Sequence, residues 1–156
     1  MSAVIDSHHD DHHHGPAKGI SRWLYTTNHK DIGSMYLWFS LIMLFIGGAM
    51  AMVIRAELFE PGSQIVSPEF YNQMVTNHGL IMVFGVIMPA FVGFANWMIP
   101  MQIGAPDMAL PRLNNLSFWI LPVAFGILLS TFFMEGGAPN FGWTFYAPLS
   151  TEYAPP

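Results

Sequence analysis

One histidine stands at the start of a long apolar run and is the residue best placed to do chemistry in this chain. His78 precedes Gly79-Leu80-Ile81-Met82, and residues 70–106 contain no Asp, Glu, Lys or Arg. A helix over residues 78–99 would be about 33 Å long at roughly 1.5 Å per residue, enough to cross the ~30 Å apolar core of a bilayer. An ionisable side chain there indicates a functional site, and imidazole is a common axial ligand of heme iron. A histidine hydrogen-bonded to a neighbouring helix, or one reaching for the interface, would explain the same position.

A carboxylate is the second candidate. Asp107 is the only acid between the second and third apolar runs, and three amides stand near it in sequence: Asn96, Asn114 and Asn115. Amide side chains both donate and accept hydrogen bonds, so they can hold ordered water beside a carboxylate. A solvated loop acid at a membrane face is the simpler explanation, and spacing alone does not separate the two.

Three helices must position these residues. Charge-free stretches of 23, 37 and 22 residues cover positions 32–54, 70–106 and 113–134, and each is long enough for a spanning helix of ~20 residues. Hydrophobic residues make up 53% of the chain and charged residues 10%, which excludes an ordinary soluble domain. We therefore predict an all-α integral membrane protein whose spans lie at about residues 34–54, 78–99 and 117–134.

Small residues indicate where these helices approach one another. Gly47 and Ala51 form a small-residue face on the first span, while Pro89 interrupts the backbone hydrogen bonding of the second. Three glycines of the second span would admit either a flat macrocycle or a neighbouring helix: Gly79, Gly85 and Gly93.

A polar tail, residues 1–22, precedes the transmembrane part, residues 23–156. It lacks the apolar core of a signal peptide. It is rich in histidine and aspartate, with His8, His9, His12, His13 and His14 beside Asp6, Asp10 and Asp11. Such a tract can bind metal, but a solvated tail is the favoured interpretation. The chain has no cysteine, so it offers neither a disulfide nor a thiolate ligand.

The basic residues predict the orientation. A cytoplasmic N-terminus places four of them inside, namely Lys18, Arg22, Lys30 and Arg112, and only Arg55 outside. His78 then lies near the outer face and Asp107 near the inner face. His29 and Lys30 are expected at headgroup level, and we do not assign His29 as a ligand.

Four segments closely resemble subunit I of the heme–copper terminal oxidases, and the bacterial cytochrome c oxidases that carry heme a are most similar. They are Thr27-Asn28-His29-Lys30-Asp31-Ile32-Gly33, the run beginning at His78, Ile103-Gly104-Ala105-Pro106-Asp107 with the residues to Asn115, and Gly142-Trp143-Thr144-Phe145-Tyr146-Ala147-Pro148-Leu149. The resemblance runs from about residue 23 to 149. It covers only the first part of a subunit that has twelve transmembrane helices, so we expect either a fragment or a subunit completed by a second polypeptide.

The resemblance implies roles near the outer face. His78 would be one axial ligand of low-spin heme a, Arg55 would hydrogen-bond the heme formyl group, and Trp143 would lie near the heme edge. Glu57 with the carbonyl of Gly62 resembles a peripheral Ca²⁺ or Na⁺ site, for which oxygen ligands are suitable. In the family, the second heme a ligand, the oxygen-binding heme and CuB are held by residues that this chain does not contain.

The resemblance also implies a proton-uptake path from the inner face. Asp107 would be its mouth, Asn96 and Asn114 would line its first part, and Tyr36 would lie along it. The whole enzyme would pass electrons from cytochrome c to O₂, producing water and pumping protons across the bacterial inner membrane. Its expected partners are the rest of subunit I, a CuA-bearing subunit II, subunit III and the lipid bilayer, with no nucleic acid.

Two alternatives stay open. The chain could belong to a quinol oxidase of the same superfamily, which takes electrons from membrane quinol. It could instead be part of a heme-free transporter or assembly protein, in which His78 and Asp107 relay protons.

Overall fold

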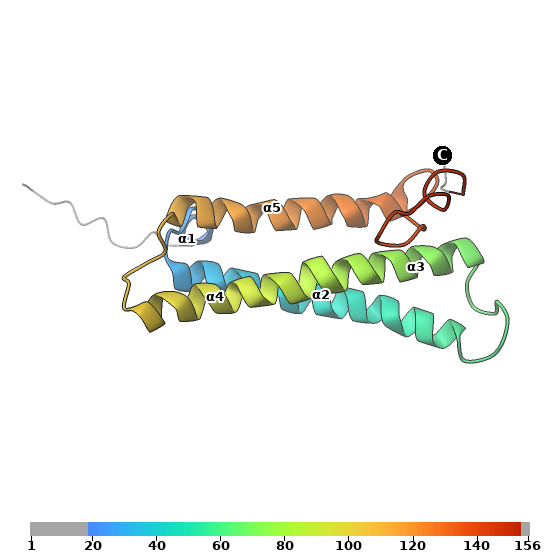
Figure 1. Ribbon diagram of the computed structural model, residues 1–156, viewed down its shortest axis with the longest axis horizontal. Helices are drawn as coiled ribbons and strands as arrows, with labels where there is room; N and C mark the ends of the chain where they lie inside the picture. The colour runs from blue at the N-terminus through green and yellow to red at the C-terminus, as the bar shows by residue number, and fades with distance from the viewer. Residues whose placement is uncertain (1–18, 154–156) are drawn as a thin grey trace, which may run out of the picture.

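Three long helical rods lie side by side in the computed structural model, which describes residues 19–153 (Figure 1). No strand occurs in that part of the chain, in agreement with the predicted all-α class. A short helix, α1, precedes the rods, and a 3-10 turn, η2, ends the third. The elements are α1 (Ile20–Tyr25), α2 (His29–Glu57), α3 (Pro68–Leu80), the π-helix η1 (Ile81–Ile87), α4 (Met88–Ile103), α5 (Pro111–Ser130) and η2 (Thr131–Phe133).

The first rod, α2, is longer at both ends than the span predicted at residues 34–54. Its start is set by Asn28, whose side chain accepts a hydrogen bond from the Lys30 N–H at 2.8 Å. Such a cap satisfies one of the free N–H groups of a helix terminus. The hydropathy of a span marks its membrane-crossing part, whereas the cap decides where the helix begins.

The second rod begins ten residues before the predicted start at His78. Ser67 caps it by accepting from the Phe70 N–H at 3.3 Å, and Pro68 occupies the first turn, where its missing N–H costs nothing. His78 therefore lies in the third turn of α3, and helical residues both precede and follow it.

Pro89 interrupts the hydrogen bonding of the second rod as predicted, and the chain accommodates it through a wider turn. Just before it, η1 is a π-helix, and the Met88 N–H bonds to the Val83 carbonyl, five residues back. From α2, the buried Ser40 hydroxyl donates to the Val86 carbonyl at 2.8 Å. A side chain of the neighbouring helix thus satisfies a backbone carbonyl of the irregular turn. Such a hydrogen-bond partner is required where a helix is interrupted at membrane depth.

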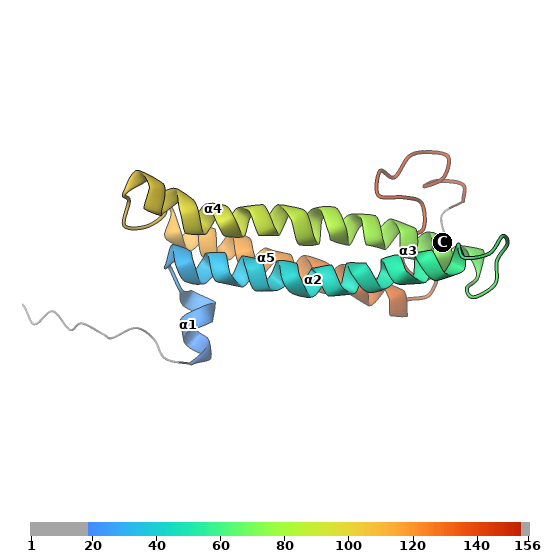
Figure 2. The same ribbon diagram turned by 90° about the horizontal axis from the view of Figure 1, so that it is seen from below.

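The third rod starts at Pro111, six residues before the predicted span, and reaches Phe133. Residues 134–153 then turn back beside the α3 end of the second rod (Figures 1 and 2). Among the described residues, three helices are long and apolar enough to cross a membrane: His29–Glu57, Pro68–Ile103 and Pro111–Phe133.

The rods meet through a small core along α2. Gly33 and Gly93 face each other across the α2–α4 contact: a Cβ on Gly93 would lie 3.0 Å from the Gly33 carbonyl oxygen. Gly85 likewise faces Phe125 of α5, so helix packing accounts for these two glycines within the described part of the chain. The buried core residues are Ile32, Met35, Tyr36, Phe39, Met43, Met50, Met74, Ile81, Phe118 and Phe125. Large apolar side chains elsewhere are exposed, as for helices that face lipid or further helices.

Candidate functional site

The imidazole of His78 is oriented by the neighbouring helix. Its Nδ1 lies 2.9 Å from the backbone carbonyl oxygen of Gly47 on α2. Because a carbonyl only accepts, Nδ1 carries the hydrogen, and in the neutral imidazole Nε2 then has the free lone pair. Metal-binding histidines are commonly held in this way, with one ring nitrogen donating to a carbonyl and the other free for the metal. The side chain is half-buried, and its donor set fits axial ligation of a heme iron.

Trp143 comes to the same turn of α3 from the loop that follows α5. A Cβ built on Gly79 would lie 3.6 Å from the indole, and the Trp143 and Phe84 rings are 6.3 Å apart between centroids. Gly79 thus faces an aromatic ring. Residues separated by more than 60 positions in sequence are brought together beside His78.

Arg55 lies on α2, eight residues after Gly47 and just over two turns beyond it. At about 100° per residue, the two positions differ by roughly 80° around the helix. The guanidinium is exposed and makes no hydrogen bond within the described part of the chain. Its predicted role toward a heme formyl group stays a prediction.

Glu57 closes the loop after α2. Its buried carboxylate accepts three backbone hydrogen bonds, from the N–H groups of Gln64 at 2.8 Å, Ile65 at 2.9 Å and Val66 at 3.0 Å. Gly62, in this loop, is exposed with φ 101°. No cluster of three or more His, Cys, Asp or Glu side chains suited to a metal occurs among residues 19–153. The geometry gives Glu57 a loop-holding role, and the predicted Ca²⁺ or Na⁺ site stays a prediction.

Asp107 lies at the opposite end of the bundle. Its Oδ1 accepts the backbone N–H groups of His29 at 3.1 Å and Met108 at 2.8 Å. The side chain is partly buried against the start of α2, so Asp107 is not the solvated loop acid that its position in the sequence would also allow. Both bonds end on Oδ1, so Oδ2 remains to take a proton or a water molecule.

The two predicted asparagines meet each other and are linked to this carboxylate through His29. Asn96 is 2% exposed, and its Oδ1 accepts a short hydrogen bond from the Asn114 Nδ2. The ring of His29, itself 6% exposed, bonds through Nδ1 to the Asn96 backbone carbonyl at 2.8 Å. His29 therefore contacts both Asp107 and Asn96 and is buried within the bundle, while the headgroup-level depth expected for it stays a prediction.

Tyr36 joins the same cluster from α2. Its hydroxyl lies 2.9 Å from the Ser117 hydroxyl, which donates to the Asn114 carbonyl at 2.6 Å. All four residues predicted for the inner face thus belong to one group linked by His29 and Ser117, two residues that the sequence analysis did not assign. The position of Ser117, three residues after Asn114 on one helix face, is the signal that could have indicated it.

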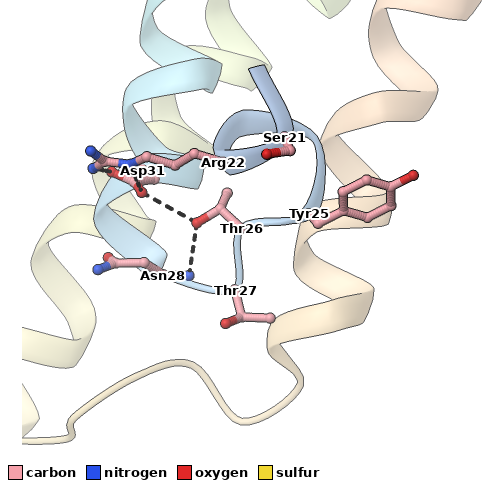
Figure 3. A pocket seen from close by; sticks show the side chains of 7 residues that line it. All are labelled: Ser21, Arg22, Tyr25, Thr26, Thr27, Asn28 and Asp31. Atoms are coloured by element: carbon pink, nitrogen blue, oxygen red, sulfur yellow. Dashed lines mark hydrogen bonds and ion pairs between the residues drawn. The ribbon is translucent and has the colours of Figure 1, made fainter. Parts of the chain in front are cut away.

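Asn115, the third amide, does not join this group. Its Nδ2 donates to the Leu24 carbonyl at 2.7 Å and fastens α1 to α5. A second anchor of α1 is the ion pair in Figure 3, where Arg22 approaches Asp31 of α2 at 2.8 and 3.1 Å and Thr26 donates to the same carboxylate. Asp31 raises the pKa of the Arg22 guanidinium through this bond. The predicted inner basic residues Arg22, Lys30 and Arg112 share this end of the bundle, while Lys18 and the His/Asp-rich tract lie outside the described residues.

Fold and site together define a multi-pass helical membrane protein with an oriented imidazole at one end and a buried polar network at the other. The family model described as "Cytochrome C and Quinol oxidase polypeptide I" matches residues 31–156. The chain belongs to this family of heme–copper oxidase subunits I.

Several relatives are similar over most of this chain. It is 47% identical to the cytochrome c oxidase subunit 1 of Corynebacterium diphtheriae over 144 residues, which are 91% of this chain and 26% of that protein. It is 49% identical to a probable cytochrome c oxidase subunit 1-alpha of Streptomyces coelicolor, covering 86% of this chain and 23% of that one. Identity to the heme-copper oxidase subunit I+III of Aeropyrum pernix is 46%, covering 88% and 17%. The chain spans about a quarter or less of these relatives' length.

Proposed function

We propose that this chain supplies the electron-relay heme ligand and the proton-uptake mouth of a respiratory cytochrome c oxidase. The observation that carries the proposal is the hydrogen bond from His78 Nδ1 to the Gly47 carbonyl, which leaves Nε2 directed by a rigid helix pair. Family membership supports it, since the matched relatives carry the name cytochrome c oxidase subunit 1.

At the outer end, His78 would hold the iron of low-spin heme a through Nε2. When bound, such a heme would supply reversible one-electron transfer, with His78 as the ligand that this chain contributes. Gly47 keeps the imidazole in one tautomer and orientation, which raises its strength as a ligand. Arg55 and Trp143 would lie against the macrocycle, where a cation and an aromatic ring alter its potential.

At the inner end, Asp107 would collect a proton from the aqueous side on Oδ2. Asn96 and Asn114 hold each other in place, so their remaining polar atoms would orient water molecules rather than rotate freely. Ser117 and Tyr36 extend the polar groups further into the bundle, because their hydroxyls can both donate and accept. The residues thus form a fixed polar lining along which water can pass a proton inward.

The two ends of the helical bundle would have different roles on opposite sides of the membrane. With the N-terminus cytoplasmic, electrons would reach His78 from the outer side while protons enter at Asp107 from the inner side. Each charge moved against the membrane potential stores ~2.3 kcal/mol per 100 mV, so this polarity conserves redox energy.

The complete enzyme would need partners. The rest of subunit I would provide the second heme a ligand, the oxygen-binding heme and CuB, and subunit II would bring CuA and accept electrons from cytochrome c. The relative named subunit I+III supports subunit III as a further partner. The exposed apolar faces of the rods suit both these helices and lipid in a bacterial inner membrane.

The quinol oxidases are the second candidate, because the matching family description names both cytochrome c and quinol oxidases. The first experiment is an optical spectrum of the purified complex that contains this chain, with pyridine extraction of its heme. Heme A, together with turnover on reduced cytochrome c, is the expected result. Heme B or O with turnover on quinol would move the assignment to the second candidate. A complex without heme would overturn both and leave His78 and Asp107 as a proton relay.

A further inference from the structure

Two polar residues directly before His78 hold the loop that carries Trp143. Thr76 is 2% exposed and Asn77 0% exposed, although both side chains are polar. Buried polar groups need partners, and here part of the partnership comes from residues 139–142, far along the chain. The hydrogen-bond partners therefore identify the loop segment that these two side chains hold in place.

Thr76 serves two elements with a single hydroxyl. It donates to the Asn72 carbonyl, one turn back on α3, at 2.8 Å. Its oxygen also accepts the backbone N–H of Gly142 at 3.0 Å. Gly142 immediately precedes Trp143, so this bond attaches the loop one residue before the indole.

Asn77 provides the second attachment. Its Nδ2 donates to the Gln73 carbonyl at 2.8 Å and to the Pro139 carbonyl at 3.2 Å. Both neighbours are acceptors, so the amide nitrogen must be the group that faces them. Its Oδ1 is buried and has no partner in the described part of the chain. The orientation of Asn77 is therefore set by the two bonds of its Nδ2, one to Gln73 in its own helix and one to the loop, and not by its oxygen.

These attachments place the indole beside the His78 turn. Trp143 is half-exposed at 51%, and its described contacts are to the α3–η1 rod, at Gly79 and Phe84. Two hydrogen bonds from the residues just before His78 therefore join the loop and the imidazole to the same helical turn.

We propose that Thr76 and Asn77 are positioning residues that hold Trp143 at a set place beside the ligand His78 and so tune the potential of its heme. The inference rests on the proposed function for the heme itself, while the attachment of the loop rests on the described hydrogen bonds alone. Fixing an aromatic side chain near a redox centre controls its local polarity and solvent access, which are terms that set its potential.

The test uses the assembled oxidase with Thr76→Val, which keeps the shape and removes the hydroxyl. Thr76→Ser restores the hydroxyl. Thr131→Val is the matched control, because the Thr131 hydroxyl donates only to Leu128 in its own turn. Two quantities are measured: hydrogen exchange of the peptide containing Gly142, and the midpoint potential and absorption band of the low-spin heme.

In Thr76→Val we expect the amide hydrogen of Gly142 to exchange about fivefold faster, because the free energy of one net hydrogen bond corresponds to about that factor. The midpoint potential and the absorption band of the low-spin heme should shift, while the heme content stays unchanged. Thr76→Ser and Thr131→Val should match the parent. Unchanged exchange would overturn the attachment, and faster exchange with an unshifted potential would overturn the tuning. If the Thr76→Val variant does not assemble, the Asn77→Leu variant is tested by the same hydrogen-exchange and heme measurements, and the same outcomes support or overturn the proposal. Survival of the six-coordinate signal in His78→Ala would overturn the heme assignment while the exchange result still judged the attachment.

Discussion

The backbone N–H of His29 donates to Oδ1 of Asp107 at 3.1 Å, joining the start of α2 to the loop between α4 and α5. The same histidine contacts the Asn96 carbonyl through its ring. The carboxylate proposed as a proton collector is therefore held by a second helix and is not a free loop acid.

Replacing Asp107 with Asn should slow proton uptake from the inner side by about tenfold or more, because the carboxylate that would accept the proton is lost. The Asn Oδ1 can still accept the N–H groups of His29 and Met108, so the local fold and the heme spectra should be retained. Turnover and proton pumping in reconstituted vesicles measure the effect. Glu135→Gln, at an exposed loop acid, is the control, and unchanged pumping in Asp107→Asn would remove Asp107 from the path.

Replacing His78 with Ala should abolish the low-spin, six-coordinate heme signal in the assembled enzyme. The cause is the loss of Nε2 as a ligand, since the helix itself is maintained by its neighbours. His29→Ala provides a comparison, because that imidazole is buried at the other end of the bundle and should leave the heme spectrum unaltered. Electron paramagnetic resonance and optical spectra measure the outcome, and a surviving signal would contradict the ligand assignment.

Tyr36→Phe removes the hydroxyl that bonds to Ser117 while keeping the ring in its edge-to-face contact with Phe118. Loss of one partly buried hydrogen bond should cost about 1 kcal/mol of stability. If the hydroxyl helps to orient water, proton uptake should fall severalfold with heme content unchanged. Time-resolved proton uptake measures this. An identical rate would assign Tyr36 to helix packing alone.

Gly93→Ala should weaken the α2–α4 contact. The added Cβ would lie 3.0 Å from the Gly33 carbonyl oxygen, and neither backbone can yield easily. Overpacking of this kind costs about 1–3 kcal/mol, so the thermal midpoint of the complex should fall. Gly48→Ala is the control because nothing lies within 4 Å of its Cβ position, and an equal loss in both variants would contradict the close-packing account.

The sequence alone determined the class and the three apolar rods, because charge-free stretches of sufficient length have few stable solutions in a bilayer. It also singled out His78 and Asp107 as candidate site residues, and their roles stay predictions. Tertiary structure decided what hydropathy does not encode. Ser67 and Asn28 moved the helix starts outward through capping, and the π-helix before Pro89 depends on support from Ser40 of another helix.

The hydrogen-bond partners of the site residues likewise could not be predicted from local sequence patterns. His29 and Asp107 are 78 residues apart, and Thr76 and Gly142 are 66 apart, yet each pair is hydrogen-bonded. Hydrophobic periodicity records which residues avoid water. Which buried polar groups meet depends on how the rods pack and where the loops return, and only the folded chain settles that.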